Sequence, residues 1–274
     1  MAFDQIGSIA ILEVRGNEDP KLIAGQIMQN NRNIKTVALK ASELRGKYRV
    51  RKLKIIAGEK TTLATYKESG CVFELDVAKV YFSPRLSFER QRIAEQVKNG
   101  EKILVLFAGV GPYAIVIAKK LKLEGKNTGE KTAGKKTTEI IAIELNPAAV
   151  KFMKRNIELN KVGNMVTAVK GDVTKVLRAY RNWADRIIMP LPHTAEKYLP
   201  QAIRSTAKSG IVHFYTFSEN RGKNKKKINP FKAAVAKVQT AAKKAKRKVK
   251  IISKRIVNTY ATGVVQVVVD VKVL

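Results

Sequence analysis

Three groups of residues in the chain have types and positions that could bind a nucleoside cofactor. Residues 107–112 (FAGVGP) follow an apolar run, and Gly109 and Gly111 would allow a tight turn whose backbone lies close to a ligand. Glu144 ends a second apolar run, where its carboxylate could accept hydrogen bonds from both ribose hydroxyls. Asp172 ends a third run, where it could accept a hydrogen bond from an adenine amino group. Together they predict a site for the adenosine part of a cofactor.

Each group taken alone has an ordinary structural explanation. G-x-G turns are common, Glu144 could be a favourable charge ahead of a helix, and Asp172 could be a helix N-cap. In this order, and each at a strand end, the three resemble the pattern of class I S-adenosylmethionine-dependent methyltransferases. The turn lacks the third glycine of the dinucleotide-binding fingerprint, which argues against NAD. S-adenosylmethionine is therefore the expected cofactor.

Strands and helices that alternate from Ser87 onward would place these groups at one edge of a sheet. Parallel strands joined by helices bind ligands outside the carboxyl ends of the strands. The expected fold class is α/β, with a Rossmann-like methyltransferase domain and a mostly parallel sheet over residues 85–274. The expected strands are Lys102–Phe107, Ile140–Ile143, Met165–Lys170, Arg186–Met189, Ile211–Phe217, Val249–Tyr260 and Val264–Lys272. The expected helices are Phe88–Lys98, Tyr113–Leu123, Ala148–Leu159, Val173–Ala179, Tyr198–Ala207 and Pro230–Arg247.

Residues 1–84 are instead typical of short strands and turns around one helix. The helical spacing of Leu22, Ile23, Ile27 and Met28 predicts a helix over Pro20–Asn30. The expected strands are Gly7–Val14, Val37–Leu39, Leu53–Ile56, Thr61–Tyr66 and Cys71–Leu75. We therefore expect a small α+β domain ahead of the larger one.

The chain carries a strong positive charge. Its 54 Lys and Arg against 22 Asp and Glu give a formal net charge of +32, which attracts polyanions and makes their binding salt-dependent. A lysine-rich proteome would produce the same excess, so charge alone indicates nucleic acid without naming RNA or DNA. Most of Leu121–Glu139 (LKLEGKNTGEKTAGKKTTE) is poor in apolar residues and is expected to form a solvated loop.

The composition also limits the class of protein. The sequence contains no run of about eighteen apolar residues, the length that a membrane-spanning helix requires. Met1–Leu12 lacks the pattern of a secretory signal. Cys71 is the only cysteine, and with only His193 and His213 besides, the sequence shows no cluster of metal ligands. We expect a cytoplasmic monomer that uses no metal and contacts no membrane.

The fourth expected strand of the large domain ends in Met189, and Pro190-Leu191-Pro192-His193 follows. In nucleic-acid methyltransferases, a short proline-containing motif at this place often presents backbone carbonyls and a polar side chain to the target base. The fixed φ of Pro190 and Pro192 suits a rigid presentation of this kind. A plain proline-rich loop after a strand is the alternative.

Longer segments resemble one family. Residues 76–90 (DVAKVYFSPRLSFER), 107–112, 156–161 (NIELNK), 184–189 (ADRIIM) and 211–215 (IVHFY) are similar to the archaeal and eukaryal tRNA (guanine-37-N1)-methyltransferase family. The likeness extends over nearly the whole chain from about Phe3, and the FSPRL-x-x-ER and FAGVGP elements are specific to this family and its wyosine-pathway relatives. The resemblance implies methylation of N1 of guanosine at position 37 of tRNA, with the anticodon stem-loop as partner.

The resemblance also implies catalytic roles. The family's general base matches Glu89, four residues after Arg85, and its partner arginine matches Arg49 in the small domain. N1 of guanine carries a proton and is a poor nucleophile until a carboxylate removes that proton. An arginine near O6 would stabilise the negative charge that develops on the base. Without the resemblance, Glu89 would be interpreted as a helix-surface residue paired with Arg92, and Arg49 as a solvated strand residue.

Carried over in the same way, Tyr81 matches a tyrosine near the methionine part of the cofactor and the target base. The small domain, residues 1–84, is expected to bind RNA or substrate. The expected base-contacting loop consists of Pro190, Leu191 and Pro192. The expected cofactor site consists of Tyr81, Arg85, Phe107, Ala108, Gly109, Gly111, Glu144, Leu145, Asp172, Val173 and Pro190.

Two departures from the family bear on the substrate. From the resemblance, we expect the chain to correspond to the family from its second domain onward, without the first one that recognises the tRNA elbow, and its basic surface to compensate. Pro190 stands where the family has asparagine, so C7 methylation of the wyosine intermediate at the same nucleotide, alone or beside N1 methylation, stays open. Glu89 disfavours aminocarboxypropyl transfer, and the intact cofactor motifs disfavour a catalytically inactive RNA-binding protein.

Overall fold

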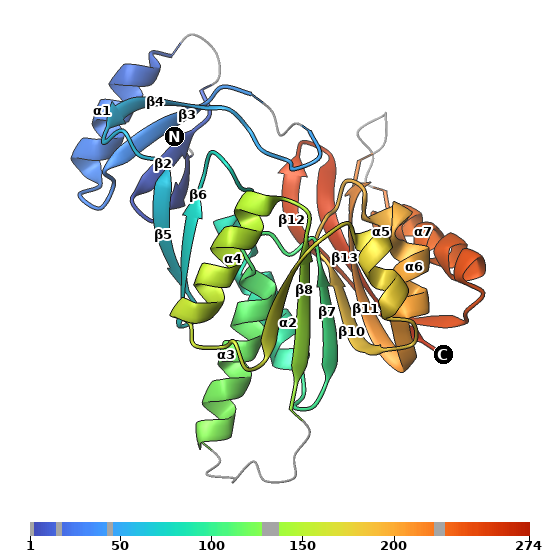
Figure 1. Cartoon of the computed structure of the whole chain (residues 1–274). Coiled ribbons are helices and arrows are strands. Elements are labelled where there is room, and N and C mark those ends of the chain that lie inside the picture. The colour runs from blue at the N-terminus through green and yellow to red at the C-terminus, as the bar shows by residue number, and fades with distance from the viewer. Residues whose placement is uncertain (1–2, 15–17, 43–45, 128–136, 222–227) are drawn as a thin grey trace.

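The computed structural model describes residues 3–14, 18–42, 46–127, 137–221 and 228–274, and Figure 1 shows a small sheet beside a larger one. The small sheet has the order β1-β2-β3-β4. β1 (Phe3–Ile6) and β4 (Leu53–Gly58) are antiparallel to their neighbours, whereas β2 (Ile9–Leu12) and β3 (Thr36–Lys40) are parallel to each other. Helix α1 (Pro20–Asn30) connects these two parallel strands and packs against the sheet.

Local sequence explains both the helix and one departure from the prediction. α1 has the predicted bounds because Asp19 caps it, accepting a hydrogen bond from the Lys21 amide at 2.9 Å, and Pro20 occupies its first position. The predicted single strand Gly7–Val14 is wrong at its start, where Gly7 has φ +58° and turns β1 back onto β2. A Cβ at Gly7 would lie 2.2 Å from the Thr65 carbonyl oxygen, so only glycine fits this turn.

A hairpin of β5 (Leu63–Glu68) and β6 (Cys71–Asp76) joins the small sheet to the rest of the molecule. Two asparagines one helical turn apart bind the backbone of β6: Asn156 lies in α4 (Pro147–Leu159), and Asn160 is its C-cap. Asn156 pairs with the Glu74 amide and carbonyl at 2.7 and 3.1 Å, and Asn160 with those of Val72 at 2.9 and 2.7 Å. These amide side chains satisfy a strand edge as a neighbouring strand would, so the hairpin is fixed to the large domain.

The large sheet has seven strands in the order β12-β13-β11-β10-β7-β8-β9. All neighbours from β11 to β9 are parallel, and β13 alone runs opposite to the other six strands, antiparallel to both β11 and β12. The predicted α/β class with a mostly parallel sheet behind a small α+β unit is therefore confirmed. Its strands are β7 (Lys102–Leu106), β8 (Glu139–Glu144), β9 (Val166–Lys170), β10 (Ala184–Met189), β11 (Thr206–Glu219), β12 (Val249–Ala261) and β13 (Val264–Val273). Its other α-helices are α2 (Ser87–Gln96), α3 (Pro112–Asn127), α5 (Val173–Val176), α6 (Leu199–Ser205) and α7 (Phe231–Ala245), with short 3-10 turns at Pro84–Leu86, Leu177–Ala179 and Ala195–Lys197.

Helices cover both faces of this sheet, as Figure 1 shows, with α2, α3 and α4 on one face and α5, α6 and α7 on the other. Alternate side chains of one strand point to opposite faces. In β7, Ile103 and Val105 pack with the first set of helices, and Leu104 and Leu106 with the second. Burial on both faces explains why these strands are continuous apolar runs.

Several boundaries differ from the predictions by a few residues, and two of the differences change an assignment. α3 continues to Asn127, so the first part of the predicted loop Leu121–Glu139 is helical, while residues 128–136 lie outside the described part of the chain. The helix predicted to reach Ala207 ends at Ser205, because Thr206 already pairs with Ala184 of β10. Among the described helices, none has the length and apolarity that crossing a membrane requires.

Candidate active site

The glycine turn and Glu144 meet at the carboxyl ends of β7 and β8. Gly109 has φ +58° and Gly111 φ +88°. One Glu144 oxygen accepts a hydrogen bond from the Gly109 amide at 2.8 Å, and the other accepts one from the Asn146 amide at 2.7 Å. Each carboxylate oxygen can accept a second hydrogen bond, so Glu144 can fix the turn and still receive hydroxyl groups of a ligand.

The two glycines of the turn have different tasks. A Cβ at Gly111 would lie 2.9 Å from Cγ of Met153 in α4, so this glycine permits close packing of the helix. A Cβ at Gly109 would meet only the Tyr81 carbonyl oxygen, at 3.8 Å, so the surface there is open. The backbone of Gly109 is thus accessible to a ligand, as the nucleoside site requires.

Asp172 lies at the carboxyl end of β9, where it caps α5. It accepts hydrogen bonds from the Thr174 amide at 2.7 Å and from the Thr174 hydroxyl. The hydrogen bond from the hydroxyl is the main cause that lowers the pKa of this carboxyl, so it is ionised at neutral pH. The N-cap role that the sequence allowed is therefore present, and contact of Asp172 with an adenine stays a prediction.

The other predicted cofactor residues take different positions. Phe107 and Leu191 pack against the same core cluster, and the Phe107 ring lies 5.0 Å from that of Tyr198. Ala108 and Val173 are buried and Leu145 is 36% exposed. Arg85 binds Asp4 of β1 at 2.7 and 2.8 Å, so it joins the small sheet to the 3-10 turn, and its contact with a cofactor stays a prediction.

The loop after β10 is a compact turn. The Leu191 amide donates to the Met189 carbonyl at 2.9 Å, and the Ala195 amide donates to the Leu191 carbonyl at 3.0 Å. Pro190 and Pro192 have no amide hydrogen, so their carbonyls are the polar groups that they can offer. The predicted rigid presentation of this loop is consistent with these hydrogen bonds.

Arg49 lies near His193 of this loop, and Tyr81 lies beside Gly109 of the glycine turn. Arg49 is in the segment between β3 and β4, with φ +53°, and its charge is the second cause, after burial, that lowers the pKa of His193. Tyr81 is 46% exposed, but the surrounding protein buries enough of its hydroxyl to raise its pKa. Among the nearby groups, Arg51 lowers this pKa and Tyr260 raises it. The segment between β3 and β4 therefore brings Arg49 and Arg51 close to His193 and Tyr81.

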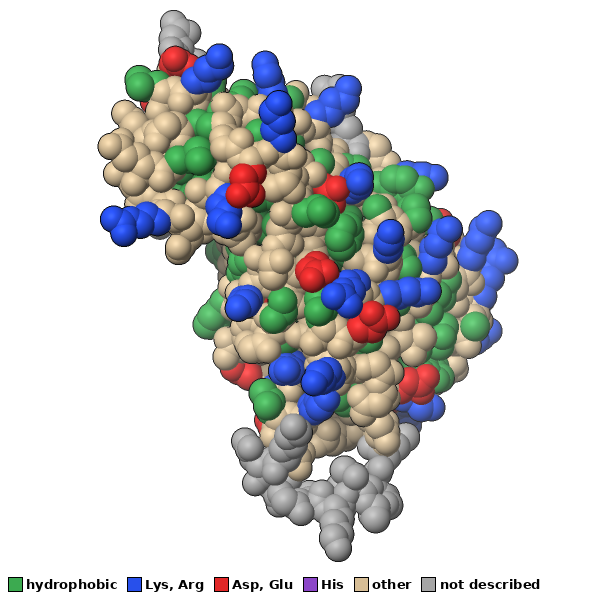
Figure 2. Space-filling model, turned by 60° about the vertical axis from the view of Figure 1, so that its left-hand side comes forward, with side chains coloured by type: hydrophobic (Ala, Val, Ile, Leu, Met, Phe, Trp, Pro, Cys, Tyr) green, Lys and Arg blue, Asp and Glu red, His purple; other side chains and the backbone are tan. Residues whose placement is uncertain are grey.

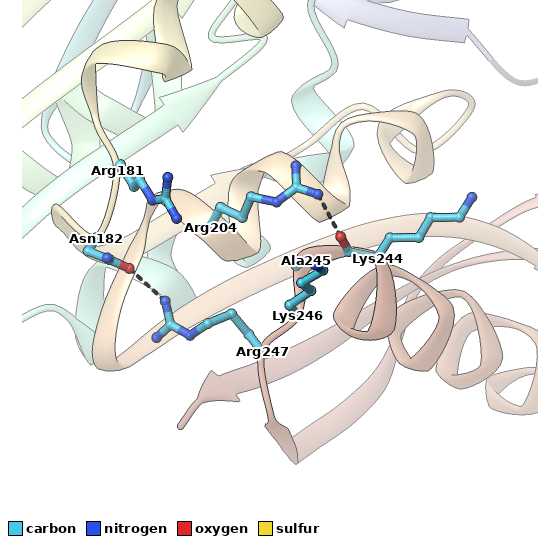
Figure 3. A pocket seen from close by; sticks show the side chains of 7 residues that line it. All are labelled: Arg181, Asn182, Arg204, Lys244, Ala245, Lys246 and Arg247. Carbon is cyan, nitrogen blue, oxygen red and sulfur yellow. Dashed lines mark hydrogen bonds between the residues drawn. The ribbon is translucent and has the colours of Figure 1, made fainter.

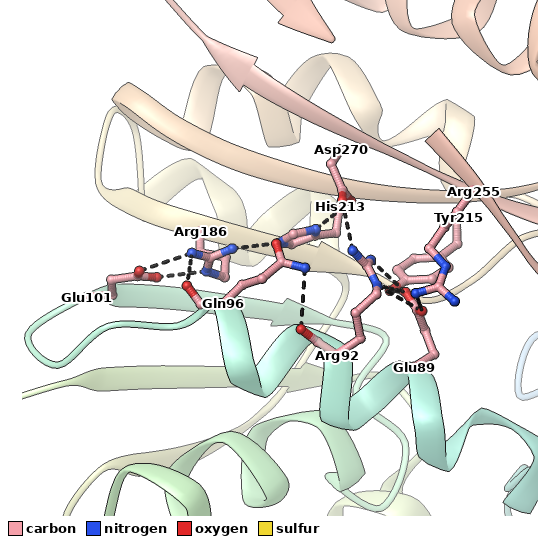
Figure 4. A network of polar contacts seen from close by, with 9 residues as sticks. All are labelled: Glu89, Arg92, Gln96, Glu101, Arg186, His213, Tyr215, Arg255 and Asp270. Atoms are coloured by element: carbon pink, nitrogen blue, oxygen red, sulfur yellow. Dashed lines mark hydrogen bonds and ion pairs between the residues drawn. The ribbon is translucent and has the colours of Figure 1, made fainter. Parts of the chain in front are cut away.

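Glu89 is buried rather than on the helix surface, with a side chain only 3% exposed (Figure 4). Arg92 donates to both carboxylate oxygens at 2.7 to 3.1 Å, and the Tyr215 hydroxyl donates at 2.6 Å. The predicted pairing with Arg92 is present, but inside the protein. Arg255 of β12 lies 3.7 Å from the same carboxylate and is the more exposed arginine beside it.

This carboxylate ends a buried chain of charges that links α2 to the sheet. Arg92 also donates to Asp270 at 2.9 Å, Asp270 binds Nδ1 of His213 at 2.7 Å, and Nε2 of His213 binds Arg186 at 2.8 Å. Arg186 then pairs with Glu101 at 2.7 and 3.0 Å. Because arginine can only donate, Nε2 must accept and Nδ1 carries the hydrogen. We call Glu101, Arg186, His213, Asp270, Arg92 and Glu89 the buried ion chain.

Sequence reasoning missed the inner members of the buried ion chain. Asp270 lies in the run VVVDVKV, His213 in IVHFY and Arg186 in ADRIIM, all parts of central strands. A charged group in a strand buried on both faces must find a partner, because leaving it unpaired costs several kcal/mol. That pattern could have indicated a network, although not which residues pair.

The buried His213 should make stability depend on pH. Burial is the main cause that lowers the pKa of His213. The hydrogen bond and charge of Asp270 raise it, whereas the charges of Arg186 and Arg92 lower it further. The unfolded chain, with an ordinary histidine pKa of 6.5, then binds more protons than the folded one below that pH. The free energy of unfolding should fall from about pH 7.5 to about pH 5.5, by up to about 1.4 kcal/mol per pH unit.

Urea denaturation at several pH values measures this slope. The chain has only one other histidine, the exposed His193, so a His193→Ala variant should keep most of the slope. A His213→Gln variant should lose most of it over this range. A wild-type stability that is flat between these pH values would contradict a neutral buried His213.

A cationic hollow of about 310 Å³ lies at the opposite edge of the sheet and is separate from these groups (Figure 3). Arg204 donates to the Lys244 carbonyl and Arg247 to the Asn182 amide oxygen, both at 2.6 Å. Cations at the C-terminal ends of α6 and α7 interact favourably with the helix dipoles, which explains their gathering. The residues that line it are Arg181, Asn182, Arg204, Lys244, Ala245, Lys246 and Arg247.

Two family models match the chain. The model described as the TRM5/TYW2 methyltransferase domain matches residues 64–251, and the one described as the TYW2 N-terminal domain matches residues 1–61. Together they cover nearly every element described above.

Individual proteins are similar over most of the chain. This chain is 36% identical to the tRNA (guanine(37)-N(1))-methyltransferase Trm5b of Pyrococcus abyssi, over 99% of this chain and 74% of that protein. It is 35% identical to the tRNA (guanine(37)-N(1))/4-demethylwyosine(37)-methyltransferase Taw22 of Nanoarchaeum equitans, over 81% of this chain and 85% of that one. A solved complex of aTrm5 and tRNALeu superposes with a TM-score of 0.82 at 32% identity, covering 100% of this chain and 72% of that one.

Proposed function

Since the chain belongs to the TRM5/TYW2 methyltransferase family, we propose that it transfers a methyl group from S-adenosylmethionine to N1 of guanosine at position 37 of tRNA. The observation that carries the proposal is the alignment of 99% of the chain, at 36% identity, with a protein of that named activity. The surface is compatible with an RNA partner, because Lys and Arg side chains outnumber acidic ones over the face drawn in Figure 2. We further propose a cytoplasmic monomer that binds the anticodon stem-loop.

The residues at the carboxyl ends of β7, β8 and β9 fit the cofactor of this family, S-adenosylmethionine. Bound there, it supplies a methyl group on a positively charged sulfur, ready for transfer to a nucleophile. We propose that Glu144 accepts hydrogen bonds from the ribose hydroxyls while it holds Gly109, and that Asp172 accepts one from the adenine. The open surface at Gly109 and the spare acceptor positions of Glu144 support this assignment.

Glu89 is our candidate for the group that removes the N1 proton. Arg92 and Tyr215 already donate hydrogen bonds to this carboxylate, so it must lose part of this shell before it can accept the N1 proton. Arg255 is the most exposed of its partners, with a side chain 34% exposed, and we propose that the entering base displaces it. Arg49 would then stabilise the negative charge on O6 from the side of the small sheet.

In vitro methylation of a tRNA transcript with guanosine at position 37, followed by nucleoside mass spectrometry, tests the function. N1-methylguanosine is the expected product, with no transfer to a transcript that carries adenosine there. We also expect the anticodon stem-loop alone to be methylated with a kcat/KM within about tenfold of the full tRNA, about 1.4 kcal/mol of transition-state stabilisation. A strict requirement for the intact elbow would contradict the stem-loop proposal and leave the reaction itself standing.

Methylation of C7 of the wyosine intermediate is the second candidate. Two observations favour it: the match of residues 1–61 to a TYW2 N-terminal domain and the similarity to Taw22, whose name covers both substrates. Pro190, where the resemblance leads one to expect asparagine, points the same way. A methyl group found only on tRNA that carries the intermediate would replace the first proposal with this one, and methylation of both tRNAs would indicate a bifunctional enzyme.

A further inference from the structure

An aromatic cluster lies where three strands end beside the cofactor motifs. His193 follows β10, Phe217 is near the end of β11, and Tyr260 is near the end of β12. The His193 ring lies 4.5 Å from that of Phe217 and 5.8 Å from that of Tyr260, and the last two are 4.2 Å apart. We call these three residues the aromatic cluster.

The cluster is next to both sides of the proposed site. Tyr260 lies close enough to the Tyr81 hydroxyl to help raise its pKa, although burial is the main cause. The backbone of Tyr81 lies beside Gly109 of the cofactor turn. After burial, the charge of Arg49, in the segment between β3 and β4, is the second cause that lowers the pKa of His193. In Figure 1 the residues just ahead of β4 extend toward the turn between β12 and β13, in agreement with this contact. The cluster therefore has Tyr81, which lies beside the cofactor turn, near one member and Arg49 near another.

The exposure of the cluster suits a nucleobase better than core packing. Tyr260 is 53% exposed and His193 is also exposed, so flat rings face solvent. Bases stack on exposed aromatic rings, and each stacked base contributes about 1–3 kcal/mol. Phe217, which is only partly buried, supports both rings from below.

His193 also has hydrogen-bonding groups to offer. No residue in the described part of the chain binds either of its ring nitrogens through a hydrogen bond or ion pair. Burial and the charge of Arg49 lower its pKa, so the ring is neutral at neutral pH, with one donor and one acceptor. The edge of a purine presents donors and acceptors side by side, which such a ring can match. Pro190, at the start of the same loop, has no polar side chain to do so.

We propose that His193 determines specificity by hydrogen-bonding an edge of the target base, while the exposed ring of Tyr260 provides the surface on which that base stacks. This rests on the proposed transfer to nucleotide 37. It explains how a loop that has proline at its first position still carries a polar side chain for the base. Phe217 has no contact with the base in this arrangement and acts through the two rings that it supports.

Three substitutions at one position separate hydrogen bonding from packing. His193→Phe keeps a ring against Phe217 and Tyr260 but removes both nitrogens, His193→Asn restores a donor and an acceptor without the ring, and His193→Ala removes everything. We expect the Ala and Phe variants to lose about 10- to 100-fold in kcat/KM for tRNA, and the Asn variant to recover at least part of the loss. Tyr260→Ala should lose a similar factor, since it removes the stacking surface.

The controls exclude a general disturbance of the loop. Lys197→Ala, an exposed change in the 3-10 turn that follows, should leave kcat/KM within twofold of wild type. Calorimetry should give an S-adenosylmethionine affinity within about twofold of wild type for every His193 variant, with unchanged melting temperatures. A wild-type kcat/KM in His193→Ala and His193→Phe would overturn the proposal. It would also be overturned if His193→Asn or Lys197→Ala lost as much kcat/KM as His193→Ala.

The outcome also separates this proposal from the reaction on which it rests. The wild-type product is identified first, on tRNA with guanosine and on tRNA with the wyosine intermediate. If only the second tRNA is methylated, the proposed function fails, and the same order of variants is expected on that tRNA because the base occupies the same place. If guanosine is methylated and the His193 variants equal wild type, only the role of the aromatic cluster fails.

Discussion

Replacing Glu89 by glutamine is expected to lower the rate of methyl transfer about 10²- to 10⁴-fold, because an amide cannot take the N1 proton. The substitution keeps the size of the side chain and an oxygen that can accept from Tyr215. It leaves Arg92 with Asp270 as its remaining charged partner, so a moderate loss of stability is expected as well. Single-turnover rates with saturating enzyme and cofactor, at a temperature where the variant is folded, isolate the chemical step.

Glu95→Gln is the matched control, since Glu95 lies on the same helix with its side chain in solvent. It should keep the wild-type rate. Cofactor affinity measured by calorimetry should be little changed in both variants. A Glu89→Gln rate within about twofold of wild type would remove Glu89 from the chemistry and leave it as an anchor of the buried ion chain.

Replacing Asp270 by alanine is expected to lower the free energy of unfolding by about 3–5 kcal/mol, because it leaves buried charged and polar partners without their acceptor. Asp270 is 2% exposed and joins Arg92 to His213. Burial alone would raise the pKa of its carboxyl, but the hydrogen bonds and charges of His213 and Arg92 outweigh burial and lower it. The ionised form is therefore the one that the fold uses at neutral pH, and its loss affects both neighbours.

Urea denaturation monitored by circular dichroism measures this loss. Asp4→Ala removes an aspartate from a more exposed ion pair, that with Arg85, and should cost at most about 1 kcal/mol. Asp270→Asn, which keeps one acceptor oxygen, should fall between the two. A loss below about 1 kcal/mol in Asp270→Ala would show that the buried ion chain does not act as an energetic unit.

The sequence predicted best those features that depend on local pattern. Apolar runs and their ends located the strands of the large sheet, and with them the edge where Gly109, Glu144 and Asp172 lie. Parallel strands bring their carboxyl ends together whatever their order, so the place of the cofactor motifs followed from strand assignment alone. Capping residues such as Asp19 fixed helix ends in the same local way.

The features that the sequence could not predict depend on contacts between distant segments. Glu89 was assigned a proton-accepting role from resemblance, but its burial beneath Arg255 and its pairing with Tyr215 require α2, β11 and β12 to meet. Arg85 was assigned to the cofactor, and the structure pairs it with Asp4, a residue of the other sheet. The aromatic cluster likewise draws its rings from three separate strand ends.

The asparagine contacts of α4 with β6 determine which parts of the molecule can move against each other. Asn156 and Asn160 fix the hairpin to the large domain, and Tyr81 follows that hairpin within a few residues. The small sheet is held to the same parts, because Asp4 of β1 binds Arg85 of the 3-10 turn and Gly7 packs closely against the Thr65 carbonyl of β5. Asn156 also donates to the Val110 carbonyl of the glycine turn at 3.1 Å, so one side chain fixes both the hairpin and this turn. The two sheets and the glycine turn are therefore expected to move together rather than separately.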